Sequence, residues 1–184
     1  RNMIDAAPED EIADAAIEKC REFVRRTGFI DAGELQSLDD TYLAARELRQ
    51  VADVVGRSYD PTNDEELYYL SLLRGADHSE RPAPEEVPST IREARGLAYA
   101  DAVDAYRSDL STWIDDRDDE YPAALGAMAT LGDHVKRIKA LQGDVDPSEA
   151  ETLVSAARSL GEAVRWDDED ALARCRDRLD RLSE

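Results

Sequence analysis

The chain has 184 residues, of which 42% are hydrophobic, and it carries a formal net charge of -20. A chain of this length buries about 70% of the surface that its extended form exposes, and its apolar content is too high for a disordered acidic tail. No run in the sequence approaches the roughly 20 apolar residues that cross a bilayer. We therefore expect a soluble cytoplasmic protein. Its acidity disfavours direct contact with nucleic acid, which requires a basic surface.

The charged residues are biased in kind as well as in sign. Lysine occurs only at Lys19, Lys136 and Lys139, so the other 20 basic residues are arginines, and they face 43 carboxylates. An acidic, lysine-poor surface is typical of proteins in concentrated salt. There the Debye length falls to about 3 Å at 1 M, and self-repulsion is screened. We interpret the composition as that of a halophile.

Helical periodicity runs through most of the chain. Apolar residues recur every three or four positions in seven stretches. The expected helices cover approximately residues 8–27, 39–55, 63–74, 90–116, 122–142, 147–164 and 168–182. No segment alternates as a strand over a useful length. The sequence therefore predicts an all-α bundle of about seven helices.

The expected helix at 90–116 carries three large aromatic side chains. Tyr99, Tyr106 and Trp113 follow one another at intervals of seven residues, so they lie on one helical face. Each ring can bury about 150–250 Å². We therefore predict that this helix is central and that the other six pack around it. The alternative is that the three rings form an exposed face for a partner.

Capping residues indicate where several helices begin. Asp146, which precedes Pro147, has the residue type and spacing of an N-cap. We also expect Asn63 and Ser89 to cap the helices that follow them. The loop 28–33 contains two apolar residues between its glycines, and we expect them to pack beneath the bundle.

The segment 76–88 contains three prolines among charged residues and cannot be helical throughout. We interpret it as a strap that crosses a single helical domain spanning residues 1–184, because the three short helices before it would bury little apolar surface alone. The alternative is that it separates two subdomains.

An acidic cluster follows the aromatic helix. Asp115, Asp116 and Asp119 have the spacing with which isoprenoid synthases hold magnesium diphosphate, and carboxylate oxygens suit this ion. However, Arg117 interrupts the cluster, and Pro122 indicates a loop. A solvated helix end is therefore the favoured interpretation, and a metal site at these three residues is the alternative.

A locally basic patch comprises His134, Lys136, Arg137 and Lys139. On an acidic protein such a patch could bind an anion or an acidic partner. We favour a simpler interpretation, in which these cations are placed toward the C-terminal end of their own helix because that end carries partial negative charge.

Cys20 and Cys175 fall on apolar helical stripes, which predicts buried free thiols. The two cysteines and the two histidines form no recognisable ligand motif. We therefore expect no cofactor within this chain.

Six short blocks carry a resemblance to a known family. They are GFID (28–31), LDDTYLAA (38–45), LLRGAD (72–77), RPAP (81–84), ARGLAY (94–99) and LGDHVK (131–136). Together they resemble a family of uncharacterised haloarchaeal proteins over nearly the whole chain. The resemblance implies that a zinc ribbon of the transcription factor B type precedes this helical region in family members.

The two CxxC pairs of such a ribbon are missing from this sequence, and the chain starts at Arg1. We interpret this start as the removal of an upstream segment. Zinc would then be a cofactor of the missing ribbon, and the resemblance implies no catalytic residue.

These observations favour a non-enzymatic helical interaction module of a halophilic archaeon, with a protein partner. Any contact with nucleic acid would be made by the ribbon or by that partner. The alternative is a small-ligand or magnesium-dependent helical enzyme that uses the acidic clusters or a pocket beside His134 and Tyr99.

The charge bias generates a prediction about stability. Dilution below about 0.5 M salt should lower the melting temperature, because carboxylate repulsion is then less screened. Thermal unfolding followed by circular dichroism across a salt series measures this. An unchanged melting temperature would contradict the halophilic interpretation.

Overall fold

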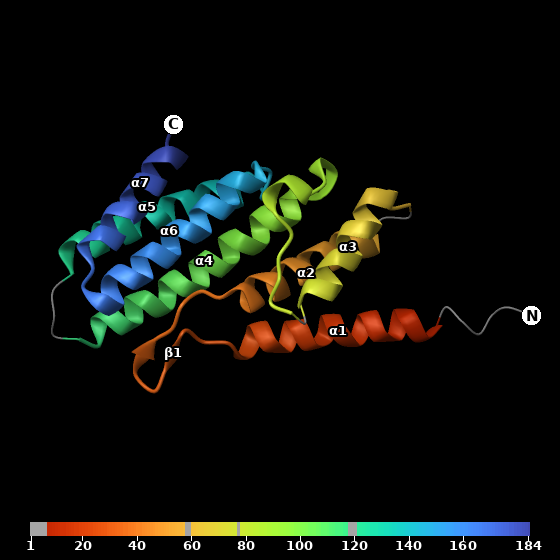
Figure 1. Cartoon of the computed structure of the whole chain (residues 1–184), viewed down its shortest axis with the longest axis horizontal. Helices are drawn as coiled ribbons and strands as arrows, with labels where there is room; N and C mark the ends of the chain where they lie inside the picture. The colour runs from red at the N-terminus through yellow and green to blue at the C-terminus, as the bar shows by residue number, and fades with distance from the viewer. Residues whose placement is uncertain (1–6, 58–59, 77, 118–120) are drawn as a thin grey trace, which may run out of the picture.

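A computed structural model describes residues 7–57, 60–76, 78–117 and 121–184 of the chain. Within these residues the helices are α1 (Ala7–Arg26), α2 (Asp40–Arg57), α3 (Asn63–Ala76), α4 (Arg92–Asp115), α5 (Pro122–Ala140), α6 (Pro147–Trp166) and α7 (Glu169–Leu182). Two short 3-10 turns, η1 (Pro84–Glu86) and η2 (Ser89–Ile91), precede α4. The predicted all-α bundle of about seven helices is confirmed (Figure 1).

A small hairpin between α1 and α2 was not expected from the sequence. Strand β1 (Ile30–Asp31) pairs antiparallel with β2 (Glu34–Leu35). The two turn residues, Ala32 and Gly33, both have positive φ, at 51° and 81°, as a type I′ turn requires. The carbonyl of Gly33 accepts a hydrogen bond of 3.0 Å from the indole of Trp113. This contact joins the hairpin to α4.

The apolar residues of the loop pack beneath the bundle, as predicted. Phe29 is buried and meets Tyr42 and Tyr106 edge to face, with ring centroids 4.9 and 5.0 Å apart. Such edge contacts are favourable beyond the burial of area alone. Ile30 is partly buried against the same core. The hairpin therefore closes one end of the core.

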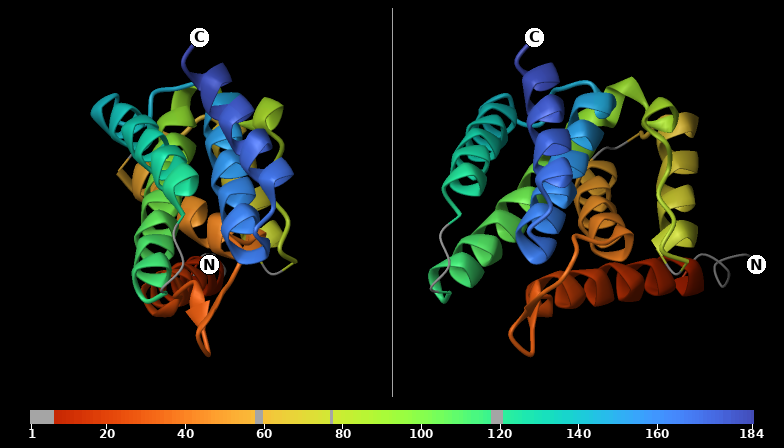
Figure 2. Two further views of the ribbon diagram at one scale, coloured as in Figure 1. Left: turned by 90° about the vertical axis from the view of Figure 1, so that its left-hand side faces the viewer. Right: turned by 60° about the vertical axis from the view of Figure 1, so that its left-hand side comes forward.

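Tyr99, Tyr106 and Trp113 on α4 are all buried, which excludes an exposed aromatic face. Helix α4 packs against α2, α5 and α6, whereas α3 packs against α2, and α7 packs against α6 and α5. Figures 1 and 2 show α5, α6 and α7 gathered at one end and α1 running beneath the other helices. The expectation that all six other helices surround α4 is therefore not confirmed.

Helix α2 contributes to two apolar clusters. Leu43 belongs to the larger cluster, with α4, α5, α6 and α7, while Leu48 and Val51 belong to a smaller one with α3. The two ends of the molecule therefore share an element. The single helical domain stays a prediction, with a division into two subdomains at the strap (76–88) as its alternative.

The predicted caps are confirmed only in part. The carboxylate of Asp146 accepts a hydrogen bond of 2.8 Å from the backbone N–H of Ser148, as expected of an N-cap. At α3, however, the capping side chain is Thr62, whose hydroxyl accepts from the N–H of Glu65, so the prediction of Asn63 is wrong. Ser89 begins η2 and does not cap α4. At α3 the hydroxyl of Thr62, one residue before Asn63, accepts from one of the first backbone N–H groups of the helix, which have no partner within the helix.

The thiol of Cys175 is free and buried, whereas Cys20 is half-buried. Burial raises the pKa of the Cys175 thiol to about 11, so this thiol is protonated and inert at neutral pH.

At the end of α6, Trp166 is 67% exposed, and the guanidinium of Arg165 lies 4.8 Å from the centre of its ring. In the described part of the chain no helix is long and apolar enough to cross a membrane.

Helix α4 touches the turn after α5 at a pair of glycines. A Cβ on Gly96 would lie 2.1 Å from the carbonyl oxygen of Gly143. Gly143 itself has φ of 81°, which side chains disfavour. The backbones can therefore meet at this point only while residue 96 has no side chain.

We expect Gly96→Ala to lower the free energy of unfolding by about 1–3 kcal/mol, because the added methyl overpacks this contact. The matched control is Gly126→Ala in α5, where nothing lies within 4 Å of an added Cβ. This control should raise stability by about 0.5–1 kcal/mol, because alanine is the better helix former. Urea unfolding at fixed salt measures the stability of both variants. Changes of the same sign would contradict a close backbone contact between Gly96 and Gly143.

Candidate functional site

A buried ion pair joins the strap to three helices. Arg95 of α4 and Glu47 of α2 are both fully buried, and two hydrogen bonds of 2.7 and 2.8 Å run from the guanidinium to the two carboxylate oxygens. Tyr68 of α3 donates its hydroxyl to the same carboxylate at 2.9 Å. Nη2 of Arg95, which donates to Glu47, also donates to the carbonyl of Pro82 in the strap at 2.8 Å. One polar centre therefore fixes α2, α3, α4 and the strap together.

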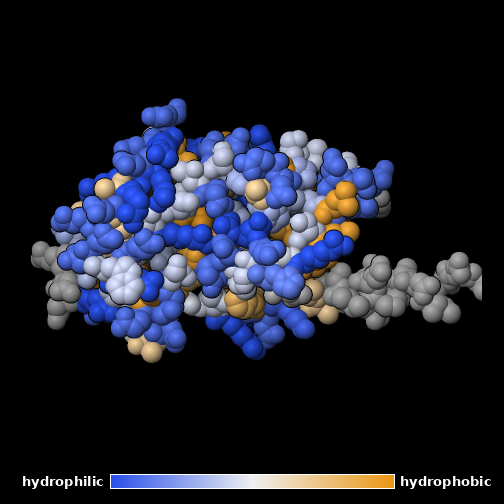
Figure 3. Space-filling model, in the orientation of Figure 1, coloured by the Kyte–Doolittle hydropathy of each residue, from blue (hydrophilic) through white to orange (hydrophobic). Residues whose placement is uncertain are grey.

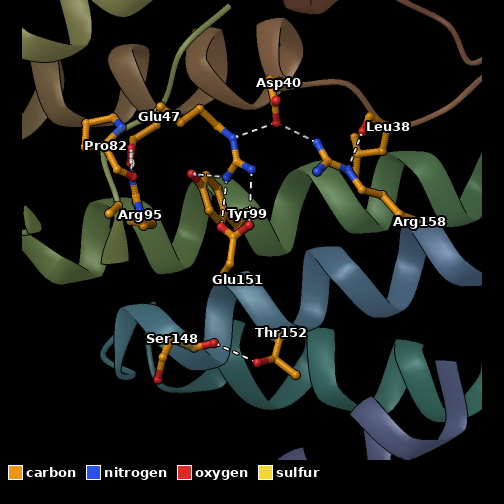
Figure 4. A network of polar contacts seen from close by, with 12 residues as sticks. Leu38, Asp40, Glu47, Pro82, Arg95, Tyr99, Ser148, Glu151, Thr152 and Arg158 are labelled. Atoms are coloured by element: carbon orange, nitrogen blue, oxygen red, sulfur yellow. Dashed lines mark hydrogen bonds and ion pairs between the residues drawn. The ribbon is translucent and has the colours of Figure 1, made fainter. Parts of the chain in front are cut away.

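A second arginine, Arg81, comes from the strap itself. It donates to Asp40 at 2.9 Å, to the hydroxyl of Tyr99 at 2.9 Å and to both oxygens of Glu151 at 2.8 and 3.1 Å. Asp40 also accepts a bond of 2.7 Å from Arg158 of α6. Figure 4 shows Asp40, Tyr99, Glu151 and Arg158 meeting between α2, α4 and α6. The strap is thus bound to α6 as well.

We call these two arginines and their carboxylates the strap clamp (Asp40, Glu47, Arg81, Arg95 and Glu151). Hydrogen bonds within the clamp shift the pKa values of Arg81 and Asp40 toward their charged forms. Burial acts against the charge of Arg81, but the hydrogen bond to Glu151 outweighs this effect and raises the pKa of Arg81 above its ordinary value. Burial also acts to raise the pKa of Asp40, yet bonds and charges from Arg158 and Arg81 lower it. The clamp therefore positions the strap against α2, α4 and α6.

Two adjoining hollows lie between α3 and the strap, with volumes of about 360 and 350 Å³. Both are lined by Leu67, Ser71, Pro82 and Glu86, so they form one groove. We call it the α3–strap groove. Because the clamp holds one wall and the bundle holds α3, the groove exists before any partner arrives.

Apolar side chains lie open along this groove. Leu67 and Leu70 are 56% and 43% exposed, and they are one helical turn apart on α3. In Figure 3 an apolar patch lies over α3 on an otherwise mostly hydrophilic face. Pro82 continues the apolar lining from the opposite wall. Such a rim of exposed apolar groups is typical of an interaction site.

Charges differ between the two parts of the groove. Arg74, Arg81, His78 and Glu80 line the first hollow, and Asp64 and Glu85 line the second. Glu86 lines both, but its carboxylate accepts a bond of 2.6 Å from the backbone N–H of Ala83 and is partly engaged. The groove therefore offers an apolar centre between a more basic and a more acidic part.

The four predicted basic residues do not form one patch. His134 is buried, its ring lies 3.4 Å from the hydroxyl of Ser183, and burial lowers the pKa of the ring below its ordinary value. Arg137 pairs with Glu149 of α6 at 2.9 Å. Lys136 is exposed.

Lys139 turns in another direction, toward α4, where it pairs with Asp101 and Asp104 at 3.1 and 3.0 Å. The predicted patch is therefore divided among α4, α6 and the end of α7. His134 and Arg137 are three positions apart and share one side of α5, whereas Lys139 comes two positions after Arg137, about 200° further round the helix, and so faces α4. An anion site at these four residues together is not supported by this geometry.

The acidic cluster lies at the end of α4. Asp115 and Asp116 are exposed at its last turn and C-cap, and Asp119 lies outside the described residues. Among the residues that the structure describes, no group of three His, Cys, Asp or Glu side chains is placed to hold a metal ion. Tyr99 lies within the clamp region, where its hydroxyl accepts from Arg81.

The sequence was compared with protein families, curated proteins and solved structures. A family model matches residues 1–179. The chain belongs to DUF7117, a family of unknown function. No curated protein matches it. No solved structure matches it either.

Membership in DUF7117 assigns no residue role, so the site is argued from geometry alone. The apolar residues of the expected helix at 63–74 occur on nearly all of its sides, a pattern that favours a short, well-buried helix. The structure corrects this: Leu72 is buried, but Leu67 and Leu70 are exposed. An excess of apolar residues on a short helix was the available signal, and it indicates a second apolar face as well as a core face.

The strap clamp generates a stability prediction. Arg95→Met should cost about 3–5 kcal/mol of unfolding free energy, because it leaves the carboxylate of Glu47 buried without its cation. The double variant Glu47→Leu, Arg95→Met should recover most of this loss, because no lone charge is left. Urea unfolding of both single variants and the double variant measures the coupling. Strictly additive losses would contradict a coupled buried pair.

Proposed function

We propose that this chain is a non-enzymatic helical interaction module that binds a protein partner through the α3–strap groove. The observation that carries the proposal is the pair of exposed leucines, Leu67 and Leu70, along a groove whose opposite wall is fixed by Arg81 and Arg95. A partner segment with apolar anchors would bury these leucines. Each leucine can contribute about 1.5–3 kcal/mol when it becomes fully buried.

Preorganisation supports the proposal. Ordering a loop on binding costs free energy that subtracts from affinity, and here the strap is already held by its hydrogen bonds to α2, α4 and α6. Concentrated salt screens charge attraction over distances beyond about 3 Å at 1 M. Apolar anchors would therefore supply most of the affinity in a halophilic cytoplasm.

The wider setting follows from the haloarchaeal resemblance. In the proposed full-length protein, a zinc ribbon of the transcription factor B type precedes this helical region, binds the zinc and provides any contact with nucleic acid. The acidic helical module would recruit a protein to that ribbon. The strong negative charge of the chain supports this division of labour, because it repels phosphate groups.

The alternative of a magnesium-dependent enzyme has less support. Asp115 and Asp116 are exposed at the end of a helix, where carboxylates are hydrated and are not gathered around a cavity. We therefore retain the interaction module as the proposed function.

The test begins with peptides selected from a random display library on the immobilised chain at high salt, with affinities measured by surface plasmon resonance. Leu67→Glu and Leu70→Glu should each weaken binding by about tenfold or more, because each removes an apolar anchor. The matched control is Leu125→Glu on α5, since Leu125 is 46% exposed and does not line this groove. Circular dichroism checks that all variants fold.

The same variants then test the natural partner. A partner retained from salt-grown cells after nuclease treatment should be lost with Leu70→Glu and kept with Leu125→Glu. Peptides or partners that bind wild type and Leu70→Glu equally well would rule out this groove as the binding site.

A further inference from the structure

A separate polar hollow of about 750 Å³ lies on α4 between α2 and α5. Its charged lining comprises Arg46 from α2, Asp101, Asp104 and Arg107 from α4, and Lys139 from α5. The hydroxyl of Ser108 also lines it. Three cations thus face two carboxylates, on a chain whose net charge is -20. The hollow is therefore locally positive.

The two carboxylates are bound most closely by the lysine. The ammonium of Lys139 lies 3.1 Å from Asp101 and 3.0 Å from Asp104. Burial acts to lower the pKa of Lys139, but these hydrogen bonds outweigh it and raise the pKa, so the ammonium is charged. Much of the negative charge in the hollow is therefore matched by one residue.

The two arginines are held more loosely. A terminal nitrogen of Arg46 lies 3.9 Å from Asp101, and one of Arg107 lies 3.8 Å from Asp104. Both separations exceed the range of a hydrogen bond. The carboxylates attract these guanidinium groups electrostatically, but the two terminal nitrogens do not donate hydrogen bonds to them.

Arg107 has a further unmatched donor. Its Nε is buried and has no hydrogen-bond partner in the described structure. Its guanidinium lies against α5 at Gly132, where an added Cβ would be 2.8 Å from the guanidinium carbon. The missing side chain at Gly132 therefore lets Arg107 lie against α5 at the edge of the hollow.

We infer that this hollow is a binding site for a small oxyanion, held by the guanidinium groups of Arg46 and Arg107 with the hydroxyl of Ser108. Arginine donors match the oxygens of phosphate and carboxylate groups in a bidentate way. The oxyanion belongs to a phosphate-bearing or a carboxylate-bearing small molecule. Asp101 and Asp104 hold Lys139 in place and limit the site to a single anionic group.

The site differs from the basic patch that the sequence predicted. Of the predicted residues it retains only Lys139, and it adds two arginines that are 61 positions apart. The site is also independent of the α3–strap groove, because the two share no lining residue.

The test is isothermal titration of the full chain with inorganic phosphate and, in a second arm, with acetate, at constant ionic strength set by sodium chloride. Saturable binding of either probe is expected, and the tighter probe identifies the type of oxyanion. Arg46→Gln and Arg107→Gln should each weaken binding about tenfold, the usual effect of losing a charge-assisted hydrogen bond. Asp104→Asn should tighten it, because a repelling charge is removed.

The matched control is Arg174→Gln, which removes the same charge from an exposed pair with Glu162. It should leave the affinity unchanged, and circular dichroism establishes that each variant folds. The inference is overturned if neither probe binds saturably, if Arg174→Gln weakens binding as much as Arg107→Gln, or if Asp104→Asn weakens it.

Discussion

The arrangement of this protein depends on one ion pair that is withdrawn from water. Glu47 and Arg95 sit within the smaller apolar region of the molecule, and their bonds extend to Tyr68 and Pro82. Burying two charges costs several kcal/mol for each ion unless hydrogen bonds replace their hydration. Here Tyr68 of α3 donates to Glu47 and Pro82 of the strap accepts from Arg95, while Nη1 of Arg95 is buried without a partner in the described structure. The pair therefore depends on α2, α3, α4 and the strap being in place together. Local folding of this end of the molecule is therefore cooperative.

The same constraint shapes the surface. A proline-rich segment that was held only by its own chain would sample many conformations, at an entropic cost for any binding. Arg81 ties this segment to α2 and α6, so its outer side is a fixed wall. The groove against α3 thus follows from contacts made on the inner side. The inner side of this segment makes the polar contacts, and its outer side forms one wall of the groove.

Periodicity predicted the helices well, whereas capping chemistry was right at Asp146 and wrong at Asn63 and Ser89. The seven periodic stretches correspond to α1–α7, and the Asp146 cap follows from its residue type and from the proline after it. The hairpin was missed because strands of two residues leave no alternation to detect. Glu47 and Arg95 were missed for a different reason: pairing across 48 positions has no local signal. The two candidate binding surfaces are likewise formed by residues from different elements, so only the packing brings them together.

The two tryptophans of the chain occupy opposite environments. The indole of Trp113 is buried and donates to Gly33 of the hairpin, while that of Trp166 is largely open to solvent beside Arg165. Intrinsic fluorescence of this protein therefore contains two separable components. A blue-shifted emission reports docking of the hairpin, and an emission quenched by acrylamide reports the turn between α6 and α7. Replacing Trp166 with phenylalanine leaves an optical signal for the hairpin alone.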